Sequence, residues 1–373
     1  MSTNQEKLNK QLLNVVADEN VSDEARLKKV KYLVYLGADV NATDEYCQTA
    51  LIVSACNGHL EVVKYLVRLG VDVNASDKYG QTALMVSVCN GHLEVVKYLG
   101  EHGADVHQKN EDGRTALMFA AYNGQLEAVK YLAEGGADLE ASDKYGKTAL
   151  MTASEYGHLE VVKYLAQGGA DLEASDKYGH TVLMVAAIYG QLDVVKYLAE
   201  GGADFEAKDK TGMTALMKVA RCGNLDMVKY LVECGMDVNA SDMYGKTALM
   251  EAVNWGKLDV VKYLTEQGAD VNESDKYGNT ALMEAVYNGD LEVVKCLVEH
   301  GADVETKDRD GRTALDIAKN LKRDDCVKFL EELQQKEVAK KPYEVKVEVL
   351  SGEKKNATVK KRGMWQRIFG GRD

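Results

Sequence analysis

The sequence predicts an all-α solenoid built from stacked pairs of short helices, and three observations support this fold class. The dipeptide Thr-Ala recurs every 33 residues from Thr49 to Thr313, with Thr181 keeping the register, which gives nine units. A second marker, Gly-Ala-Asp or a near variant, recurs with the same spacing from Asp39 to Asp303. The 373-residue chain also holds 33 glycines but one proline, Pro342, so its repeated turns depend on glycine.

Residues 143–175 show how one unit is built. Thr148 is the expected N-cap of a first helix of about nine residues, which Gly157 ends. A second helix is expected to begin at His158 and to end at Gly168. A helix pair this short cannot bury its apolar face alone, so neighbouring units have to stack. The inward positions of the second helix are Val161, Val162 and Leu165.

The N-terminal segment departs from the repeat. Residues 4–17 predict a polar amphipathic helix, and residues 22–36 predict its partner. We assign residues 1–43 to this N-terminal capping pair, because a solenoid needs polar ends to stay soluble.

The C-terminal end departs from the repeat as well. Residues 44–337 are assigned to the repeat array, whose last unit has Lys322 where the other units have glycine. Its second helix is expected from Asp324 to about Lys336 and is highly charged. Residues 338–373 form a separate tail, and Pro342 marks the boundary because proline commonly follows a helix end.

The repeated unit resembles the ankyrin repeat, with the pattern D-x-x-G-x-T-x-L, a short helix, G-H-L-x-x-V, a second helix and G-A-D-V-N-A. The resemblance covers roughly residues 20–335. The family's Thr-Pro-Leu-His becomes Thr-Ala-Leu-Met here, so alanine takes the first helical position, where proline is optional. Methionine cannot make the hydrogen bond with which the family's histidine braces the turn, so we expect apolar packing instead. These methionines are Met85, Met118, Met151, Met184, Met217, Met250 and Met283.

Composition excludes several classes of protein. No run of about 18 apolar residues occurs, so we expect no membrane span, and the N-terminal residues lack the apolar stretch of a secretory signal. Seven scattered cysteines argue against a disulfide framework and for a reducing compartment. We therefore expect the protein in the cytoplasm, with the nucleus or the cytosol of a host cell as alternatives.

No pattern typical of catalysis or metal binding interrupts the repeat. The P-loop, zinc-protease and nucleophile-elbow motifs are absent. His59, His92 and His158 occupy the repeat's own Gly-His-Leu position, and Cys56 and Cys89 share another position without a CxxC partner. The aspartates of the Gly-Ala-Asp marker are expected to accept hydrogen bonds within their own turns. The sequence therefore predicts no catalytic residue, no metal, no cofactor and no enzymatic activity.

The family resemblance implies that the turn tips and first helices line a concave face, which binds a protein partner. Six of the nine tips carry tyrosine, which offers contact area and a hydroxyl group. Recent duplication, with the rings packed on one another along the stack, is an equal alternative. The candidate tip residues are Tyr79, Tyr145, Tyr178, Tyr244 and Tyr277, together with Lys144 and Lys177.

The ends of the first helices differ between units, so copying does not explain their aromatic residues. We expect them to form an exposed aromatic groove from residue 119 to residue 287, with packing between repeats as the alternative. Trp255 is the expected hot spot. The candidates are Phe119, Tyr122, Tyr156, Tyr189, Trp255 and Tyr287.

The second helices carry the recurring sequence VVKYL. Their tyrosines are expected to pack, and their lysines are expected to form a solvated basic stripe. The chain has a net charge of −13, and residues 338–373 hold ten Lys and Arg against four Asp and Glu, a net +6. The remainder therefore carries −19, which repels phosphate, so we expect no nucleic-acid partner.

The tail combines three features. Residues 343–350 alternate like a half-buried strand, residues 354–362 are basic, and residues 363–371 hold the motif Met364, Trp365, Ile368 and Phe369. Three interpretations stay open. The tail docks on the solenoid in cis or on another copy, it is a linear motif or surface anchor for a separate partner, or its basic residues form a nuclear import signal.

These observations predict a non-catalytic protein that binds a folded protein partner on its concave face, as a scaffold or an inhibitor. The alternative is a tethering adaptor or effector. In that case the repeats select cargo, and the basic aromatic tail attaches to a membrane or to a host complex. The sequence does not identify the partner, because fold alone does not define function.

Overall fold

The computed structural model describes residues 3–18, 20–340, 344–345 and 357–358. The chain divides into two compact units, Met1–Met243 and Tyr244–Asp373, which are described separately. In both units short helices follow one another in pairs, so the predicted all-α solenoid is confirmed.

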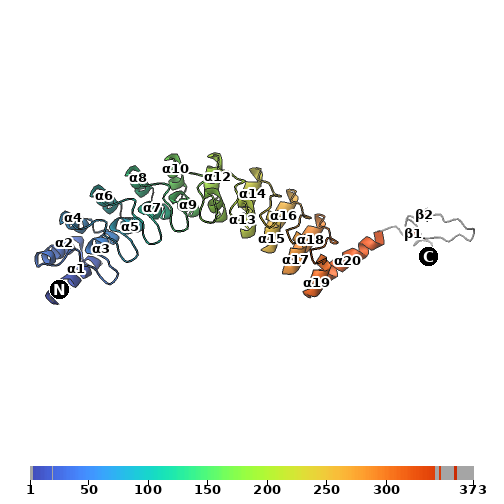
Figure 1. Ribbon diagram of the computed structural model, residues 1–373, viewed down its shortest axis with the longest axis horizontal. Helices are drawn as coiled ribbons and strands as arrows, with labels where there is room; N and C mark the ends of the chain where they lie inside the picture. Colours follow the sequence, from blue (N-terminus) through green and yellow to red (C-terminus); the bar gives the residue numbers. More distant parts are fainter. Residues whose placement is uncertain (1–2, 19, 341–343, 346–356, 359–373) are drawn as a thin grey trace, which may run out of the picture. The chain divides into compact units, whose positions relative to one another are not determined.

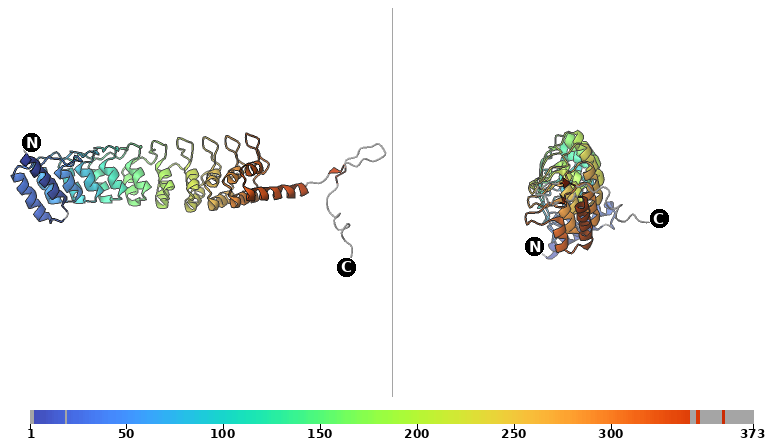
Figure 2. Two further views of the ribbon diagram at one scale, coloured as in Figure 1. Left: turned by 90° about the horizontal axis from the view of Figure 1, so that it is seen from below. Right: turned by 90° about the vertical axis from the view of Figure 1, so that its right-hand side faces the viewer.

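The first unit consists of seven helix pairs. Its first helices stack in sequence from α1 to α13, and its second helices stack alongside them from α2 to α12 (Figures 1 and 2). The helices are α1 (Thr3–Ala17), α2 (Asp23–Tyr35), α3 (Ala50–Cys56), α4 (Leu60–Arg68), α5 (Ala83–Cys89), α6 (Leu93–Glu101), α7 (Ala116–Tyr122), α8 (Leu126–Glu134), α9 (Ala149–Glu155), α10 (Leu159–Gln167), α11 (Val182–Ile188), α12 (Leu192–Glu200), α13 (Ala215–Cys222) and α14 (Leu225–Glu233).

The second unit contains α15 (Ala248–Asn254), α16 (Leu258–Glu266), α17 (Ala281–Asn288), α18 (Leu291–Glu299), α19 (Ala314–Asn320) and α20 (Asp324–Lys340). Two short strands, β1 (Glu344–Val345) and β2 (Ala357–Thr358), pair antiparallel, with Glu344 opposite Thr358. The other positions of the expected strand at 343–350 lie outside the described residues. Helix α20 extends beyond its predicted end near residue 336.

A threonine caps each of the nine first helices that follow the N-terminal pair. As predicted, Thr148 is such a cap, and its Oγ1 accepts a hydrogen bond from Met151 N at 3.3 Å. Helix α9 is seven residues long and therefore shorter than predicted. It ends early because Gly157 adopts a left-handed conformation with a φ of 73°, directly after the C-cap Tyr156.

The turn tips are braced by side-chain and backbone hydrogen bonds. Asp143 Oδ1 accepts from the backbone N–H groups of Tyr145 at 2.8 Å and Lys147 at 2.9 Å. Lys177 N in the next tip donates to Tyr145 O at 2.8 Å. Gly146 lies in this turn with a φ of 82°, and a Cβ atom there would lie 2.8 Å from Lys177 N. The tip is thus held without the family's turn histidine.

The methionines that replace this histidine belong to the core. Met151 is fully buried, and so are the predicted inward positions Val161, Val162 and Leu165. Among the residues that the structure describes, two adopt the left-handed conformation without being glycine, namely Cys47 with a φ of 60° and Lys322 with a φ of 55°. Such a conformation costs about 1–2 kcal/mol in an L-residue.

Candidate functional site

In the first unit the turn tips project on the side of the first helices, opposite the row of second helices (Figure 1). The tip tyrosines of this unit are exposed. Lys78 Nζ lies 4.0 Å from the centre of the Tyr46 ring and 5.0 Å from that of Tyr79. Lys144 Nζ lies 5.2 Å from the Tyr145 ring and also pairs with Asp112. Lysine side chains thus contact the rings of Tyr46, Tyr79 and Tyr145, and the Tyr178 ring lies 5.8 Å from the His180 ring. Among the described tips of this unit, the rings do not pack on one another as the duplication alternative expects.

Aromatic side chains at the ends of α7, α9 and α11 are also exposed. The Tyr122 and Tyr156 rings meet edge to face, with their centres 4.5 Å apart. Tyr156 is 45% exposed, and Tyr189 is exposed as well. Lys147 Nζ lies 5.9 Å from the centre of the Tyr189 ring. These rings contact neighbours yet keep much of their surface in solvent, so packing between repeats does not fully account for them.

Phe119 does not fit the predicted exposed stripe, because its side chain is only 9% exposed. The equivalent positions in two other units are Val86 and Val185, and both are buried. Other units have Thr152, Lys218, Glu251 and Glu284 at this position, so it is not an apolar core position throughout the repeat. The Phe119 ring itself is buried, and the prediction that it is exposed was wrong. Phe119 nevertheless lines a small cavity beside Tyr122.

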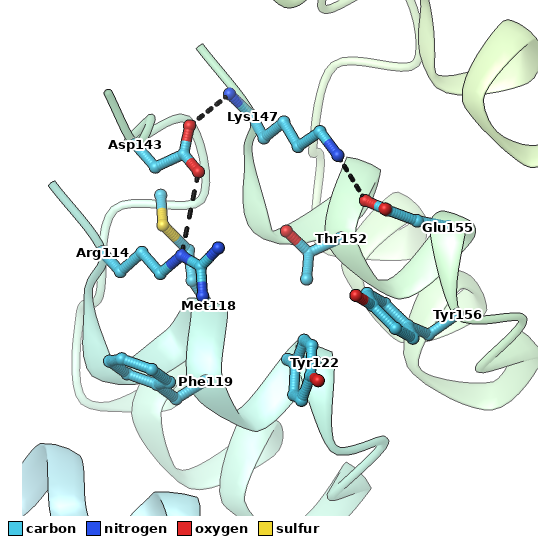
Figure 3. Close-up of a pocket in the computed structure, with 9 residues that line it drawn as sticks. All are labelled: Arg114, Met118, Phe119, Tyr122, Asp143, Lys147, Thr152, Glu155 and Tyr156. Carbon is cyan, nitrogen blue, oxygen red and sulfur yellow. Dashed lines mark hydrogen bonds and ion pairs between the residues drawn. The ribbon is translucent and has the colours of Figure 1, made fainter. Parts of the chain in front are cut away.

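This cavity, of about 60 Å³, lies between α7 and α9 (Figure 3). Arg114 and Phe119 lie on one side of it, and Thr152 and Tyr156 lie on the other, with Tyr122 between them. Arg114 Nε is 3.9 Å from Asp143 Oδ2. The remaining lining residues are Met118, Asp143, Lys147 and Glu155.

An ion pair borders the cavity. Lys147 Nζ lies 2.5 Å from Glu155 Oε2, and Glu155 is almost fully buried. Burial lowers the pKa of Lys147, but the hydrogen bond from its ammonium group to Glu155 outweighs this effect, so the pKa lies above its usual range. Burial also raises the pKa of Tyr189, and the Glu155 carboxylate raises it further. Lys147 thus neutralises a carboxylate on the side of the first helices from which the turn tips project. We call this side the candidate face.

A second charged cluster surrounds His180 in the same unit. His180 Nδ1 is 3.0 Å from Asp176 Oδ2, and its Nε2 is 3.7 Å from Asp209 Oδ2. Lys218 Nζ contacts Asp209 Oδ2 at 2.6 Å. Burial raises the pKa of Asp209, but hydrogen bonds from Lys218 and Thr211 outweigh burial and hold the pKa below its usual range.

The residue directly before the cap threonine also contributes to this site, and the sequence reasoning considered only Lys147 among such residues. It is Arg114, Lys147 and His180 in three successive units and Lys246 in the second compact unit. The sequence could have pointed to this position, because its residue type varies between units while the threonine after it does not. The structure places the residue beside the first helix on the candidate face.

The second unit carries its own exposed aromatic residues. Trp255 is 49% exposed, Tyr244 and Tyr277 are exposed tip residues, and Tyr287 is half-buried. Lys246 Nζ lies 3.2 Å from Glu284 Oε1. A groove continuous from residue 119 to residue 287 spans both units and stays a prediction.

Comparison with protein families agrees with this architecture. A model for ankyrin repeats in three copies matches residues 21–110, 102–176, 142–209, 183–275 and 269–340. The chain belongs to the ankyrin-repeat family. No curated protein matches the chain in a sequence comparison. Ankyrin repeats are protein–protein interaction modules and are typically non-catalytic, so the kind of partner that this family implies is a protein.

In the second helices of the ankyrin units, most lysines of the expected basic stripe have a carboxylate partner. Their tyrosines are half-buried as predicted, and Tyr131 Oη donates to Lys97 O at 2.9 Å. Five of the lysines pair with a glutamate three residues earlier, at 2.7–3.4 Å, so their charge is compensated. These lysines are Lys64, Lys97, Lys130, Lys163 and Lys295.

The repeat's own histidines and aspartates have structural partners. His92 Nε2 lies 2.9 Å from Cys56 O, and His158 Nε2 lies 2.9 Å from Tyr122 O, so both brace the preceding ankyrin unit. Asp171 Oδ1 accepts from Glu173 N at 2.9 Å, within its own turn as predicted. Over the described ranges, no three His, Cys, Asp or Glu side chains are grouped as metal ligands would be.

The tail motif of Met364, Trp365, Ile368 and Phe369 lies outside the described residues. None of the helices that the structure describes has both the length and the apolar character needed to cross a bilayer.

Proposed function

We propose that the chain is a non-catalytic protein that binds a folded protein partner on the face formed by its turn tips and first helices. It acts there as a scaffold or as an inhibitor. The observation that carries this proposal is the exposure of large aromatic side chains at positions that differ between units. Tyr122, Tyr156 and Tyr189 belong to this set in the first unit, and Trp255 belongs to it in the second.

Physical chemistry favours a protein partner for such a surface. Trp, Tyr and Arg are enriched among the residues that dominate the binding energy of protein interfaces, and Trp and Tyr bury a large area with only two rotatable side-chain bonds. The turn tips that carry tyrosine are braced in two ways. An aspartate such as Asp143 accepts two backbone hydrogen bonds within the turn, and backbone hydrogen bonds join neighbouring tips. A braced face loses little conformational entropy on binding, which favours affinity.

Affinity capture from cell lysate tests the proposal. The intact chain is compared with Tyr189→Ala, Trp255→Ala and the matched control Tyr35→Ala, since Tyr35 is 86% exposed but lies on α2, away from the ankyrin tips. A hot-spot aromatic residue contributes about 2–4 kcal/mol, so captured partners should be lost from at least one face variant and retained by the control. Equal retention by all four proteins would contradict the assignment of this face.

The second candidate function is a tethering adaptor or effector, and the sequence of the tail favours it. Residues 338–373 combine a net charge of +6 with Trp365 and Phe369, a composition suited to an anionic surface. The chain and a variant ending at Lys340, which keeps α20 whole, are to be compared for binding to vesicles with anionic lipid. Binding that requires residues 341–373 would favour the adaptor, and equal binding of both proteins would count against it.

A further inference from the structure

The small cavity between α7 and α9 has an arginine at its edge that makes little use of its hydrogen-bond donors. The Arg114 side chain is 41% exposed. Its closest carboxylate oxygen is Asp143 Oδ2, 3.9 Å from Nε, which is beyond hydrogen-bonding distance. In the part of the chain that the structure describes, Arg114 donates one hydrogen bond, from its backbone N–H to Asn110 Oδ1.

Arg114 differs in this respect from other cations on the candidate face. Lys147, Lys218 and Lys246 each hold a carboxylate oxygen at 2.5–3.2 Å. Asp143 Oδ1 accepts two backbone hydrogen bonds in its own turn, and its Oδ2 faces Arg114 at a distance that allows an ion pair but no hydrogen bond. The guanidinium group of Arg114 therefore has a planar set of donors available to a bound group.

The cavity limits the size and the charge of that group. A cavity of this kind needs about 10–15 Å³ for each water molecule, so 60 Å³ accepts about four to six heavy atoms. This is enough for a carboxyl group and its attached carbons. A cationic group would be repelled by Arg114. Of the two carboxylates that line the cavity, Glu155 is compensated by Lys147. Asp143 Oδ2 lies 3.9 Å from Arg114 Nε, so a bound carboxylate would share Arg114 with Asp143. The rings of Phe119 and Tyr122 supply an apolar wall for a short methylene stem.

We propose that this cavity binds the carboxylate side chain of an aspartate or glutamate from a partner protein, with Arg114 as the group that recognises it. The two carboxylate oxygens accept hydrogen bonds from two N–H groups of the guanidinium, a geometry that lysine cannot reproduce. The inference deepens the proposed function and rests on it, because the acidic residue is one contact within the larger protein interface.

Peptide selection on the intact chain tests the inference. Phage-displayed random peptides of about twelve residues are selected on the wild-type chain and depleted on Arg114→Met. The expected result is a set of peptides that share one acidic residue. Changing this residue to its amide should weaken binding to the wild type about ten- to hundredfold, the range for a charge-assisted hydrogen bond. The same change should weaken binding to Arg114→Met less than about twofold.

Two further variants sharpen the test. Arg114→Lys keeps the charge but loses the planar fork, so it should bind the acidic peptides several-fold more weakly than the wild type. Lys28→Met removes one charge from an exposed position on α2, away from the turn tips, and should bind them within about twofold of the wild type. Thermal unfolding of each variant shows whether the fold is kept.

The inference is overturned if the selection yields no peptide, if the selected peptides share no acidic residue, or if acid and amide versions bind equally. It is also overturned if synthetic peptides with phosphoserine in place of the acidic residue bind more tightly, because the site would then be selective for phosphate. Loss of captured partners in Tyr189→Ala or Trp255→Ala, together with any of these results, would leave the proposed function standing and reject the carboxylate site alone.

Discussion

Alanine substitution at three neighbouring glycines can separate the cost of backbone conformation from the cost of contact between tips. Gly146 has a φ of 82°, and a Cβ atom there would lie 2.8 Å from Lys177 N. Gly136 has a φ of 88°, but a Cβ atom would meet nothing within 4 Å. Gly135 has a φ of −74°, and Leu69 occupies the equivalent position with a φ of −79°. Only the first site combines a left-handed backbone with a blocked Cβ position.

The three substitutions should therefore differ in size and in sign. Gly136→Ala should lower the free energy of unfolding by about 1 kcal/mol. The left-handed conformation is unfavourable for alanine, and this cost exceeds the stabilisation that comes from the lower conformational entropy of its unfolded chain. Gly146→Ala should lower it by about 2–3 kcal/mol, since the hydrogen bond from Lys177 N to Tyr145 O must also give way. Gly135→Ala should raise it by about 0.5–1 kcal/mol.

Urea unfolding followed by far-ultraviolet circular dichroism measures these differences. A long repeat array need not unfold in one transition, so amide hydrogen exchange over residues 138–180 supplies the local free energy of opening. Equal losses for Gly146→Ala and Gly136→Ala would refute the contact between tips. A loss for Gly135→Ala as large as that for Gly136→Ala would refute the role of backbone conformation.

Three further predictions concern single residues. Lys322→Gly should raise the free energy of unfolding by about 0.5–1 kcal/mol because Lys322 has a φ of 55°, whereas Lys322→Ala keeps the strain and should show no such gain in urea. Burial, with Cys56 nearby, raises the pKa of Cys89 to about 11, so iodoacetamide should label Cys89 much more slowly than the exposed Cys222 near pH 8.5. Equal labelling rates, read by mass spectrometry, would contradict this. The pKa of Asp209 lies below its ordinary value of 3.8, so its stabilisation is present above pH 3.8 and is lost as the pH falls through the lower folded-state pKa. Lys218→Met should cost about 1–3 kcal/mol at neutral pH and flatten this acid transition, and an unchanged pH profile would contradict the ion pair.

The features that could be predicted from the sequence depend on local spacing. Thr148 caps α9 by accepting from a residue three positions later, and Asp171 accepts from a residue two positions later. Such contacts are determined by the backbone of a single unit, so a repeated sequence implies them directly. The same holds for the inward positions Val161 and Leu165, which follow from helical periodicity.

The features that could not be predicted depend on which side chains meet across the fold. Lys147 and Glu155 are eight residues apart, and their contact depends on the direction of both side chains beside α9. The burial of Phe119 was missed because aromatic character was taken as a sign of exposure. The equivalent positions hold valine in some units but Lys218, Glu251 and Glu284 in others, so the repeat did not indicate whether Phe119 is buried.

The division between constant and varied positions supports the proposed function independently of any single aromatic residue. The tips are held by aspartate and backbone hydrogen bonds, and the methionines replace the turn histidine inside the core. Neither the turn nor the core therefore requires Tyr156, Tyr189 or Trp255, which keep about half of their surface exposed. An exposed aromatic residue gains little stability from folding, because its apolar area stays in contact with water. Burial of that area by a partner would contribute to the free energy of binding. This contribution is largest where several such residues lie on a braced face.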